Sequence, residues 1–348
     1  MDIQAEQDKP IDPDAIRIIA IKLPFDLQER VHTFPFLHAL RDYYPDAELH
    51  FITPKKNIEV LNLLPFTAFY HEFDDGEIKT VFDVHRFCAH MIIGNVDLFI
   101  SLTNSFVDAC LGIALRSKRR LGFADGWKGM LFTEKISRPL GHHLSEDFNA
   151  LYNYHTQKEI SARLRVTSRE LPLASADWED SSYIAINLYP LRESMIADEW
   201  RELAGLFEGQ HLIFFTSDEI EKVLPHVELF MKQLPTQNQY SFIKTNNWIE
   251  FGKLFAHARG VITYEGAAGA VAAYTGAQTI ALYDREDPQR LGPFYFLADV
   301  MVCGVNDPTL VQTVGASSNA GQVRKVFDMH EIYTRALDFF KLSIKKSS

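Results

Sequence analysis

The chain has 348 residues, a length that suits two domains of about 150 residues each better than one continuous core. Its 47% hydrophobic and 23% charged residues exclude collagen-like and disordered classes. The net charge of -11 opposes non-specific attraction to a nucleic-acid backbone or an anionic bilayer, so no nucleic-acid partner is expected.

The cysteines and the apolar segments exclude further classes. Cys88, Cys110 and Cys303 lie far apart without a CxxC pair, so they form neither a disulfide framework nor a zinc cluster. The N-terminal residues are polar and acidic, unlike a secretory signal, and we expect a cytoplasmic protein. The longest apolar stretch, 261–283, contains Glu265 and three glycines, which argues against a membrane span.

The first half of the chain alternates short β-branched runs with helical patterns. It opens with the run 16–22, which is typical of a buried parallel strand, and a helix of period 3.6 follows over 33–44. Further strands are predicted at 47–53, 68–73, 97–102 and 120–123, and further helices at 57–64, 79–93 and 106–115. Such a βαβ series indicates a parallel sheet covered by helices on both faces.

A connector rich in Pro, Ser and acidic residues lies between 155 and 182, and a second αβ series follows it. Strands are predicted at 183–188, 211–216, 240–244, 260–264 and 278–283, and helices at 197–207, 217–234, 248–258, 267–274 and 322–341. The sequence therefore predicts two Rossmann-like domains in tandem. The expected parts are a polar tail 1–15, an N-terminal domain 16–165, a C-terminal domain 183–321, and a helical segment 322–348 that packs back across the domains.

Parallel sheets bind ligands beyond the carboxyl ends of their strands, so two such sheets that face each other predict one central cleft. In the loop after the first strand, Asp26 and Glu29 lie at a helix start, where a carboxylate can act as general base toward a hydroxyl. The alternative is that both carboxylates only stabilise the positive end of the helix dipole.

A second candidate is the segment 261–270, where an apolar strand ends at Glu265 and a turn of small residues opens a helix. Such a turn lets a phosphate or sugar approach the backbone, and Glu265 can bind a hydroxyl. Small residues in this position also serve close packing. The spacing of Gly266 and Gly269 is not a P-loop, because the Lys-Ser/Thr ending is missing.

Two polar clusters complete the candidates. The basic run 117–120 suits a phosphorylated or carboxylated acceptor, and it equally suits a solvated strand entrance. His142, His143 and Glu146 raise the question of a metal, but neighbouring histidines on a helix diverge and no third ligand has suitable spacing, so no metal site is expected. No GxSxG or HExxH motif is present, which disfavours serine hydrolases and zinc peptidases.

The order of several motifs resembles the ADP-heptose:lipopolysaccharide heptosyltransferases, glycosyltransferase family 9. The resemblance spans roughly residues 16–300. The motifs that carry it are, in order, IIAIK at 18–22, HTFPFLHALRDYYPDA at 32–47, DLFISL at 97–102 with NS at 104–105, RRLGF at 119–123, GAQTIALY at 276–283, DP at 287–288 and GP at 292–293.

The resemblance implies a GT-B fold, with two Rossmann-like domains whose parallel sheets face a central cleft. It also implies an inverting transfer of a sugar from a nucleotide-diphosphate donor, such as ADP-heptose, to a lipopolysaccharide-core or related glycan acceptor. The family's proposed base, three residues before the His-Thr pair, falls on Glu29, in a loop one residue longer than the family's. The acceptor-side residues it implies are Asp26, His32, Asn104, Arg119 and Arg120.

On the donor side the sequence departs from the family. The motif Asp-Ser/Thr-Gly-x-x-His falls on Glu265, Gly266 and Ala267, and Ala270 stands in place of its His. Where the family has a Lys, Glu193 stands, with Arg192 as the neighbouring cation that can replace it. The acidic loop after the second strand of that domain contributes Ser217 and Glu219.

These departures leave a second reading open. The scaffold can belong to a non-catalytic binding protein that has lost donor-site residues, or to another enzyme of the same fold, such as a sugar-nucleotide epimerase. For the transferase, the resemblance implies a nucleotide sugar and a glycolipid or glycan as partners. It implies no separate cofactor and at most peripheral association with the inner membrane.

Overall fold

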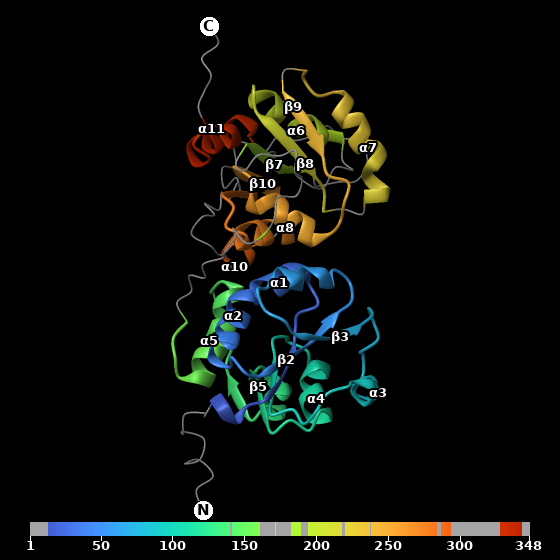
Figure 1. Ribbon diagram of the computed structural model, residues 1–348, viewed down its shortest axis with the longest axis vertical. Helices are drawn as coiled ribbons and strands as arrows, with labels where there is room; N and C mark the ends of the chain where they lie inside the picture. The colour runs from blue at the N-terminus through green and yellow to red at the C-terminus, as the bar shows by residue number, and fades with distance from the viewer. Residues whose placement is uncertain are drawn as a thin grey trace, which may run out of the picture. The chain divides into compact units, whose positions relative to one another are not determined.

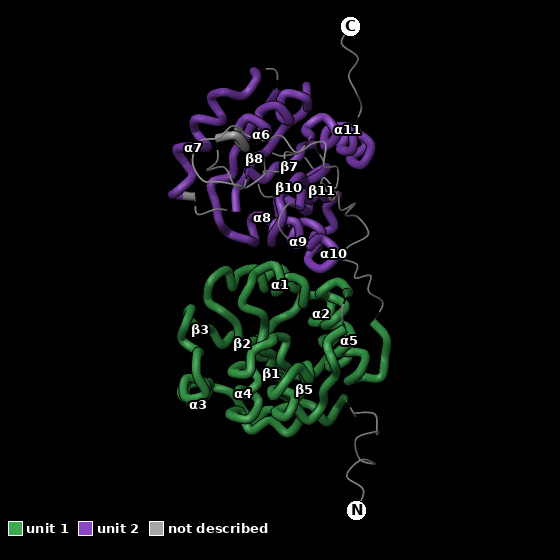
Figure 2. Tube along the Cα trace, turned by 180° about the vertical axis from the view of Figure 1, so that it is seen from behind, with its two compact units in different colours: residues 1–164 green, residues 165–348 purple. Residues whose placement is uncertain are grey.

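The structure is a computed structural model that describes residues 13–139, 141–160, 171, 182–188, 194–217, 220–236, 238–283, 287–293 and 328–342, without the side chains of 194–197 and 220. The chain divides into two compact units, residues 1–164 and 165–348 (Figure 2). Each unit is an α/β structure built on one parallel sheet.

The first unit holds a six-stranded parallel sheet of order β3-β2-β1-β4-β5-β6. Its strands are β1 (Ile18–Lys22), β2 (Glu48–Pro54), β3 (Phe69–Phe73), β4 (Leu98–Ser101), β5 (Arg119–Phe123) and β6 (Glu134–Ile136). The central strand β1 is buried from Ile19 to Lys22, as a strand covered on both faces must be. The loop after β1 therefore lies in the middle of the sheet's carboxyl edge.

Helices cover both faces of this sheet (Figure 1). They are α1 (Leu27–His32), α2 (Phe34–Tyr43), α3 (Val81–His90), α4 (Phe106–Ala114) and α5 (Leu144–Thr156), with the 3-10 helices η1 (Pro13–Ala15), η2 (Ile58–Leu63) and η3 (Gly126–Leu131). Helices α3 and α4 pack on a core that includes Ala20 and Phe99, whereas Ile19 and Ile21 alternate to the other face. Helices α2 and α5 pack against each other.

The second unit holds a five-stranded parallel sheet of order β11-β10-β7-β8-β9. Its strands are β7 (Tyr183–Asn187), β8 (His211–Phe215), β9 (Gln239–Phe242), β10 (Gly260–Tyr264) and β11 (Thr279–Leu282). Its helices are α6 (Ser194–Leu206), α7 (Ile220–Lys232), α8 (Trp248–Ala256), α9 (Ala267–Tyr274), α10 (Pro288–Leu291) and α11 (Met329–Phe339). The loops that follow β7, β8 and β10 lie at the carboxyl edge of this sheet.

Helix α11 belongs to the core of the second unit. Asp328 caps its first turn, and Met329, Ile332 and Ala336 are buried in a cluster that α6 and α7 also line. The described helix is shorter than the predicted 322–341, of which 322–327 lie outside the described residues. That it also reaches the first domain stays a prediction.

The two parallel sheets confirm the predicted fold class, and the differences are local. The predicted helix 57–64 is the 3-10 helix η2. A helix start was expected near Asp26 and Glu29, but no helix was predicted over α1 itself, nor were β6, α5 and α10 predicted. Helix α1 escapes a search for apolar periodicity because three of its buried side chains, Gln28, Arg30 and His32, are polar. Within the described residues, no helix is both long and apolar enough to cross a bilayer.

Candidate functional site

The loop after β1 presents two carboxylates at the start of α1. Asp26 is the N-cap residue, and its Oδ1 accepts a hydrogen bond from the backbone N–H of Glu29 at 3.0 Å. Both side chains are exposed. Asp26 therefore has a structural role in capping the helix, and Glu29 presents its carboxylate in the first turn, where the helix dipole favours the ionised form.

Arg30 fixes the position of this loop. Only 1% exposed, it donates to the carbonyl oxygens of Pro24 and Phe25 after β1 and to those of Lys56 and Asn57 after β2. Burial lowers the pKa of its guanidinium to about 10, which leaves it charged at neutral pH. Four carbonyl partners tie two neighbouring loops together beneath Glu29, a role that the sequence pattern did not reveal.

Lys22 places a buried ammonium at the end of β1. Its Nζ donates to the carbonyl oxygen of Leu23 at 3.0 Å, lies 3.6 Å from Asp108 Oδ2 in the first turn of α4, and stands 4.5 Å from the centre of the Phe73 ring. Burial lowers the pKa of this amine, and the carboxylate of Asp108 opposes that shift. The pair links the central strand to the helix that follows β4.

A polar network joins the loops after β4, β5 and β6. Lys128 is 5% exposed, and its Nζ donates to Asn104 Oδ1 at 2.9 Å and lies 3.3 Å from Asp125 Oδ2. Arg138 lies 3.8 Å from the same Asp125 carboxylate and 3.3 Å from Asp147. The structure thus gives the predicted residue Asn104 two basic neighbours, Lys128 directly and Arg138 through Asp125, which sequence reasoning missed.

His32 is buried at the end of α1, with 2% of its surface exposed. Its ring meets the ring of His143 edge-on, with 4.8 Å between the ring centres. His143 begins α5, where its Nδ1 accepts a hydrogen bond from the Ser145 N–H. The predicted residue His32 thus links α1 to α5, while Glu29 stands exposed one turn earlier.

Arg119 and Arg120 lie at the amino end of β5, opposite the edge that carries Glu29. Arg119 pairs with Glu134, and Arg120 donates to the carbonyl oxygens of Ser117 and Leu131. The structure does not bring these two predicted acceptor residues together with Glu29, so we leave them out of the candidate site. Their position agrees with the alternative reading of the run 117–120 as a strand entrance.

In the second unit, Asn187 joins three strand ends. It ends β7, is 1% exposed, and its Nδ2 donates to Thr263 Oγ1 of β10 at 3.1 Å. The same nitrogen lies 3.5 Å from Ser217 Oγ, which follows β8 and is exposed. The predicted donor residue Ser217 therefore lies beside a buried amide that the sequence pattern did not single out.

The turn between β10 and α9 contains a glycine in an unusual backbone conformation. The Glu265 N–H donates to the Leu282 carbonyl oxygen at 2.8 Å, and Gly266 then takes φ 114° and ψ -168°, a conformation that L side chains rarely adopt. Among the described residues, no side chain caps α9, whose first turn begins at Ala267. An uncapped helix start after a glycine, with Gly266 in open space, can bind an anion such as a diphosphate.

Two predicted donor residues, Arg192 and Glu219, lie outside the described residues. Within the part of the chain that the structure describes, no group of three or more His, Cys, Asp or Glu side chains can hold a metal ion.

The family of the chain is shown by one comparison. The family model described as glycosyltransferase family 9 (heptosyltransferase) matches residues 84–313. A search among functionally curated proteins found no match.

Solved structures resemble the chain over most of its length. The glycosyl transferase family 9 protein from Veillonella parvula is 15% identical with a TM-score of 0.72, covering 96% of this chain and 99% of that one. The E. coli ADP-heptose lps heptosyltransferase II is 15% identical with a TM-score of 0.66, covering 94% and 99%. The E. coli heptosyltransferase WaaC with ADP is 13% identical with a TM-score of 0.67, covering 82% and 92%.

Proposed function

The chain belongs to glycosyltransferase family 9, and from this membership we propose that it transfers a sugar from a nucleotide-diphosphate donor to a hydroxyl of a lipopolysaccharide-core or related glycan. The observation that carries the proposal is the start of α9 after Gly266, which has no side-chain cap among the described residues and can receive a diphosphate. The proposed transfer inverts the configuration at the anomeric carbon.

We place the donor at the carboxyl edge of the second sheet. The N–H groups of the first turn of α9 and the hydroxyl of Ser217 face developing negative charge there, while Glu265 takes a sugar or ribose hydroxyl. The solved WaaC structure contains ADP, which supports an adenosine diphosphate group as the first donor to test. Arg192 and Glu219 remain donor-side candidates by resemblance.

We assign the general base to Glu29. Its ionised carboxylate takes the proton of the acceptor hydroxyl as the hydroxyl oxygen forms a bond to the anomeric carbon. The bond from that carbon to the diphosphate oxygen breaks at the same time, and the diphosphate leaves toward the helix start that balances its charge. A single displacement of this kind produces inversion.

The acceptor belongs, in this proposal, to the loops of the first unit. Asn104 can hydrogen-bond a sugar hydroxyl of the acceptor, and Lys128, which is itself paired with Asp125, holds Asn104 in place. Because such an acceptor is a glycolipid or its glycan, we propose peripheral contact with the membrane during the reaction.

The transferase is tested by incubating the full chain with a panel of nucleotide sugars and lipopolysaccharide-core acceptors. We expect Glu29→Gln to lower turnover by about 10²–10⁴-fold, the usual contribution of a general base. The matched control is Asp26→Asn, which keeps an N-cap side chain and removes only a charge, so most turnover should remain. Unchanged turnover in Glu29→Gln, or its loss only in Asp26→Asn, would exclude Glu29 as the base.

A second candidate, a non-catalytic binding protein of the same fold, is favoured by one observation. Ala270 is a buried apolar residue of α9 at the position where the family motif has a His. Calorimetry with ADP, UDP and GDP separates the cases. Measurable nucleotide affinity supports the enzyme, and no binding at millimolar nucleotide supports the binding protein that has lost its donor site.

A further inference from the structure

Helix α4 and the 3-10 helix η3 expose large apolar side chains to solvent. On α4, Phe106 is 46% and Ile113 is 51% exposed, and their spacing of seven residues places them on one face of the helix. On η3, Trp127 is 79% and Met130 is 67% exposed, and their spacing of three residues aligns them on one face of a 3-10 helix. We call these four side chains the α4/η3 surface.

The two apolar stripes lie on neighbouring elements. Helix α4 packs against η3. At one end, Lys128 of η3 donates to the side chain of Asn104, which lies just before α4. At the other end, Arg120 donates to the carbonyl oxygens of Ser117, which follows α4, and of Leu131, which ends η3. Contiguous exposed apolar side chains of this size mark a contact surface for a partner or a membrane.

Three cations border the α4/η3 surface. Arg116 is exposed shortly after α4, and Arg120 and Lys135 donate to the carbonyl oxygens of Leu131 and Gly129 in η3. Among the described residues, no carboxylate forms an ion pair with any of these three, which we call the bordering cations. The chain as a whole carries a net charge of -11, so this region is locally positive in an acidic protein.

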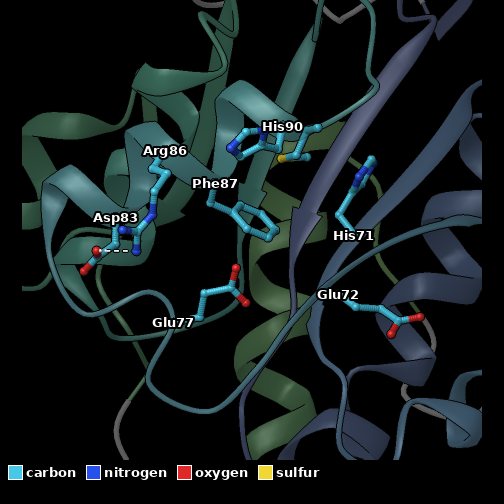
Figure 3. Close-up of a pocket in the computed structure, with 8 residues that line it drawn as sticks. His71, Glu72, Glu77, Asp83, Arg86, Phe87 and His90 are labelled. Atoms are coloured by element: carbon cyan, nitrogen blue, oxygen red, sulfur yellow. Dashed lines mark hydrogen bonds and ion pairs between the residues drawn. The ribbon is translucent and has the colours of Figure 1, made fainter.

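Helix α3, which packs against α4, carries charges of both signs. Asp83 and Arg86 form an ion pair on α3 at 3.0 Å, beside a pocket of about 480 Å³ that Glu77 also lines (Figure 3). Charged groups cost free energy when an apolar phase covers them. We therefore restrict the contact surface to α4 and η3.

We propose that the α4/η3 surface binds an anionic phospholipid bilayer, with its four apolar side chains in the interfacial region of the lipids and the bordering cations against the lipid headgroups. Tryptophan is enriched at membrane interfaces, and anionic lipids attract nearby Lys and Arg side chains. A second copy of this chain fits less well, because two chains of net charge -11 repel each other.

The position of the surface also suits the acceptor. Asn104, the acceptor residue of the proposed function, lies two residues before Phe106 and bonds to the residue after Trp127. A glycolipid held in the same bilayer therefore reaches Asn104 without leaving the membrane. This step rests on the proposed function, whereas the binding of the bilayer rests on the surface alone.

The first test measures co-sedimentation of the full chain with lipid vesicles. Vesicles of phosphatidylcholine and phosphatidylglycerol should bind the chain, and vesicles of phosphatidylcholine alone should bind it about tenfold more weakly or less, because they lack net negative charge. Absence of binding to both kinds of vesicle, or equal binding to both, would overturn the proposal.

The second test changes the apolar side chains. Ile113→Glu should weaken binding to the anionic vesicles by about tenfold or more, and Trp127→Ala, which adds no charge, by about fivefold or more. The matched control is Leu229→Glu, which adds the same charge at a 57% exposed position of helix α7 in the second unit and should bind like the wild type. Equal losses in the two glutamate variants would mean that net charge alone governs binding, and unchanged binding in Ile113→Glu and Trp127→Ala would exclude the surface.

The third test removes one bordering cation. Arg116→Gln should weaken binding to anionic vesicles by about fivefold, the usual effect of one cation near a lipid surface. Its control is Lys232→Gln, which removes an exposed cation at the end of α7 in the second unit and should change little. Equal effects of the two variants would overturn the placement of the cations against the headgroups.

Two further measurements separate the alternatives. In sedimentation velocity without lipid, a dimer that Ile113→Glu dissociates, with vesicle binding that the same variant keeps, would assign the surface to a second copy and overturn the proposal. The vesicle tests contain no nucleotide sugar, so their outcome is independent of the proposed transferase. With a water-soluble core oligosaccharide as acceptor, Ile113→Glu should turn over like the wild type. Vesicle binding without any transfer by the wild type would overturn the transferase and support the bilayer surface.

Discussion

Glu134 ties three parts of the first unit together through its carboxylate. One oxygen pairs with Arg119 of β5, and the other lies 2.6 Å from Nδ1 of His155 at the end of α5. His155 Nε2 lies 2.7 Å from the hydroxyl of Tyr44, which follows α2. Only 14% of the Glu134 side chain is exposed. If Glu134 loses its charge, Arg119 and His155 each lose a partner that water cannot fully replace. Arg119 is thus part of the internal structure.

This network predicts an acid-sensitive contribution to stability. Burial alone would raise the pKa of Glu134, but hydrogen bonds from His155 and Arg119 outweigh it and hold the pKa below the ordinary 4.5. A lowered folded-state pKa stabilises the protein above pH 4.5 and ceases to do so as the pH falls through the folded value. Glu134→Gln should therefore lower the free energy of unfolding by about 1.5–3 kcal/mol at pH 7.

Urea unfolding of the first unit at several pH values checks this prediction. The difference between wild type and Glu134→Gln should be largest near pH 7 and should shrink below pH 4.5. A difference that stays constant from pH 7 to pH 3 would show that the charge of Glu134 does not contribute. Glu159→Gln, an exposed charge change in the same unit, is the control and should move stability by less than about 0.5 kcal/mol.

At the scale of elements, Gly260 sets how closely α11 approaches the second sheet. A Cβ added at this first residue of β10 would stand 2.4 Å from the ring of Phe340, which is 2% exposed just beyond α11. Gly260→Ala should therefore destabilise the second unit by about 1–3 kcal/mol, the usual cost of overpacking. Phe340→Leu in the same chain should restore part of the loss.

Gly205 offers the matched control for thermal unfolding of these variants. It lies in α6, where an added Cβ would stand 3.7 Å from Pro235, an ordinary contact. Gly205→Ala should be neutral or stabilising by up to about 1 kcal/mol, because alanine favours a helix. If Gly260→Ala has the same melting temperature as the wild type, the Phe340 ring can move aside without cost, and this contact does not set the position of α11.

The elements also show which parts of the fold a single sequence predicts. Buried parallel strands such as β1, β7 and β10 were predicted to within two residues, because burial on both faces leaves continuous apolar runs. The strand β6 was missed because three residues, two half-buried on either side of the exposed Lys135, are too few to give a periodic signal. Helix α5 was missed because it buries polar residues among its apolar ones.

The candidate site was predictable only in part, for a related reason. Asp26, Glu29 and Gly266 lie in the segments that follow apolar strands, so the pattern itself places them near a carboxyl edge. Lys128 could not be predicted in this way. Its contact with Asn104 forms only because the loop after β5 folds against the loop after β4. Contacts between loops distant in the chain leave no local pattern in one sequence.

At the scale of the whole molecule, the net charge of -11 bears directly on the proposed donor. A nucleoside diphosphate is an anion, and the long-range field of the protein repels it while the start of α9 attracts it locally. The two effects differ in range. The field of the whole chain extends over about 30 Å at 0.01 M salt but over only about 8 Å at 0.15 M.

Salt should therefore speed the binding of a nucleotide to this chain. We expect the association rate of ADP to rise by about two- to tenfold between 0.01 and 0.15 M salt, because screening removes the distant repulsion first. Stopped-flow measurement with a fluorescent ADP analogue checks this, and the corresponding neutral nucleoside should show no such dependence. A rate that falls with salt would mean that local cations dominate the approach. In that case Arg192→Gln should abolish the salt dependence, which would make Arg192 the cation that meets the diphosphate.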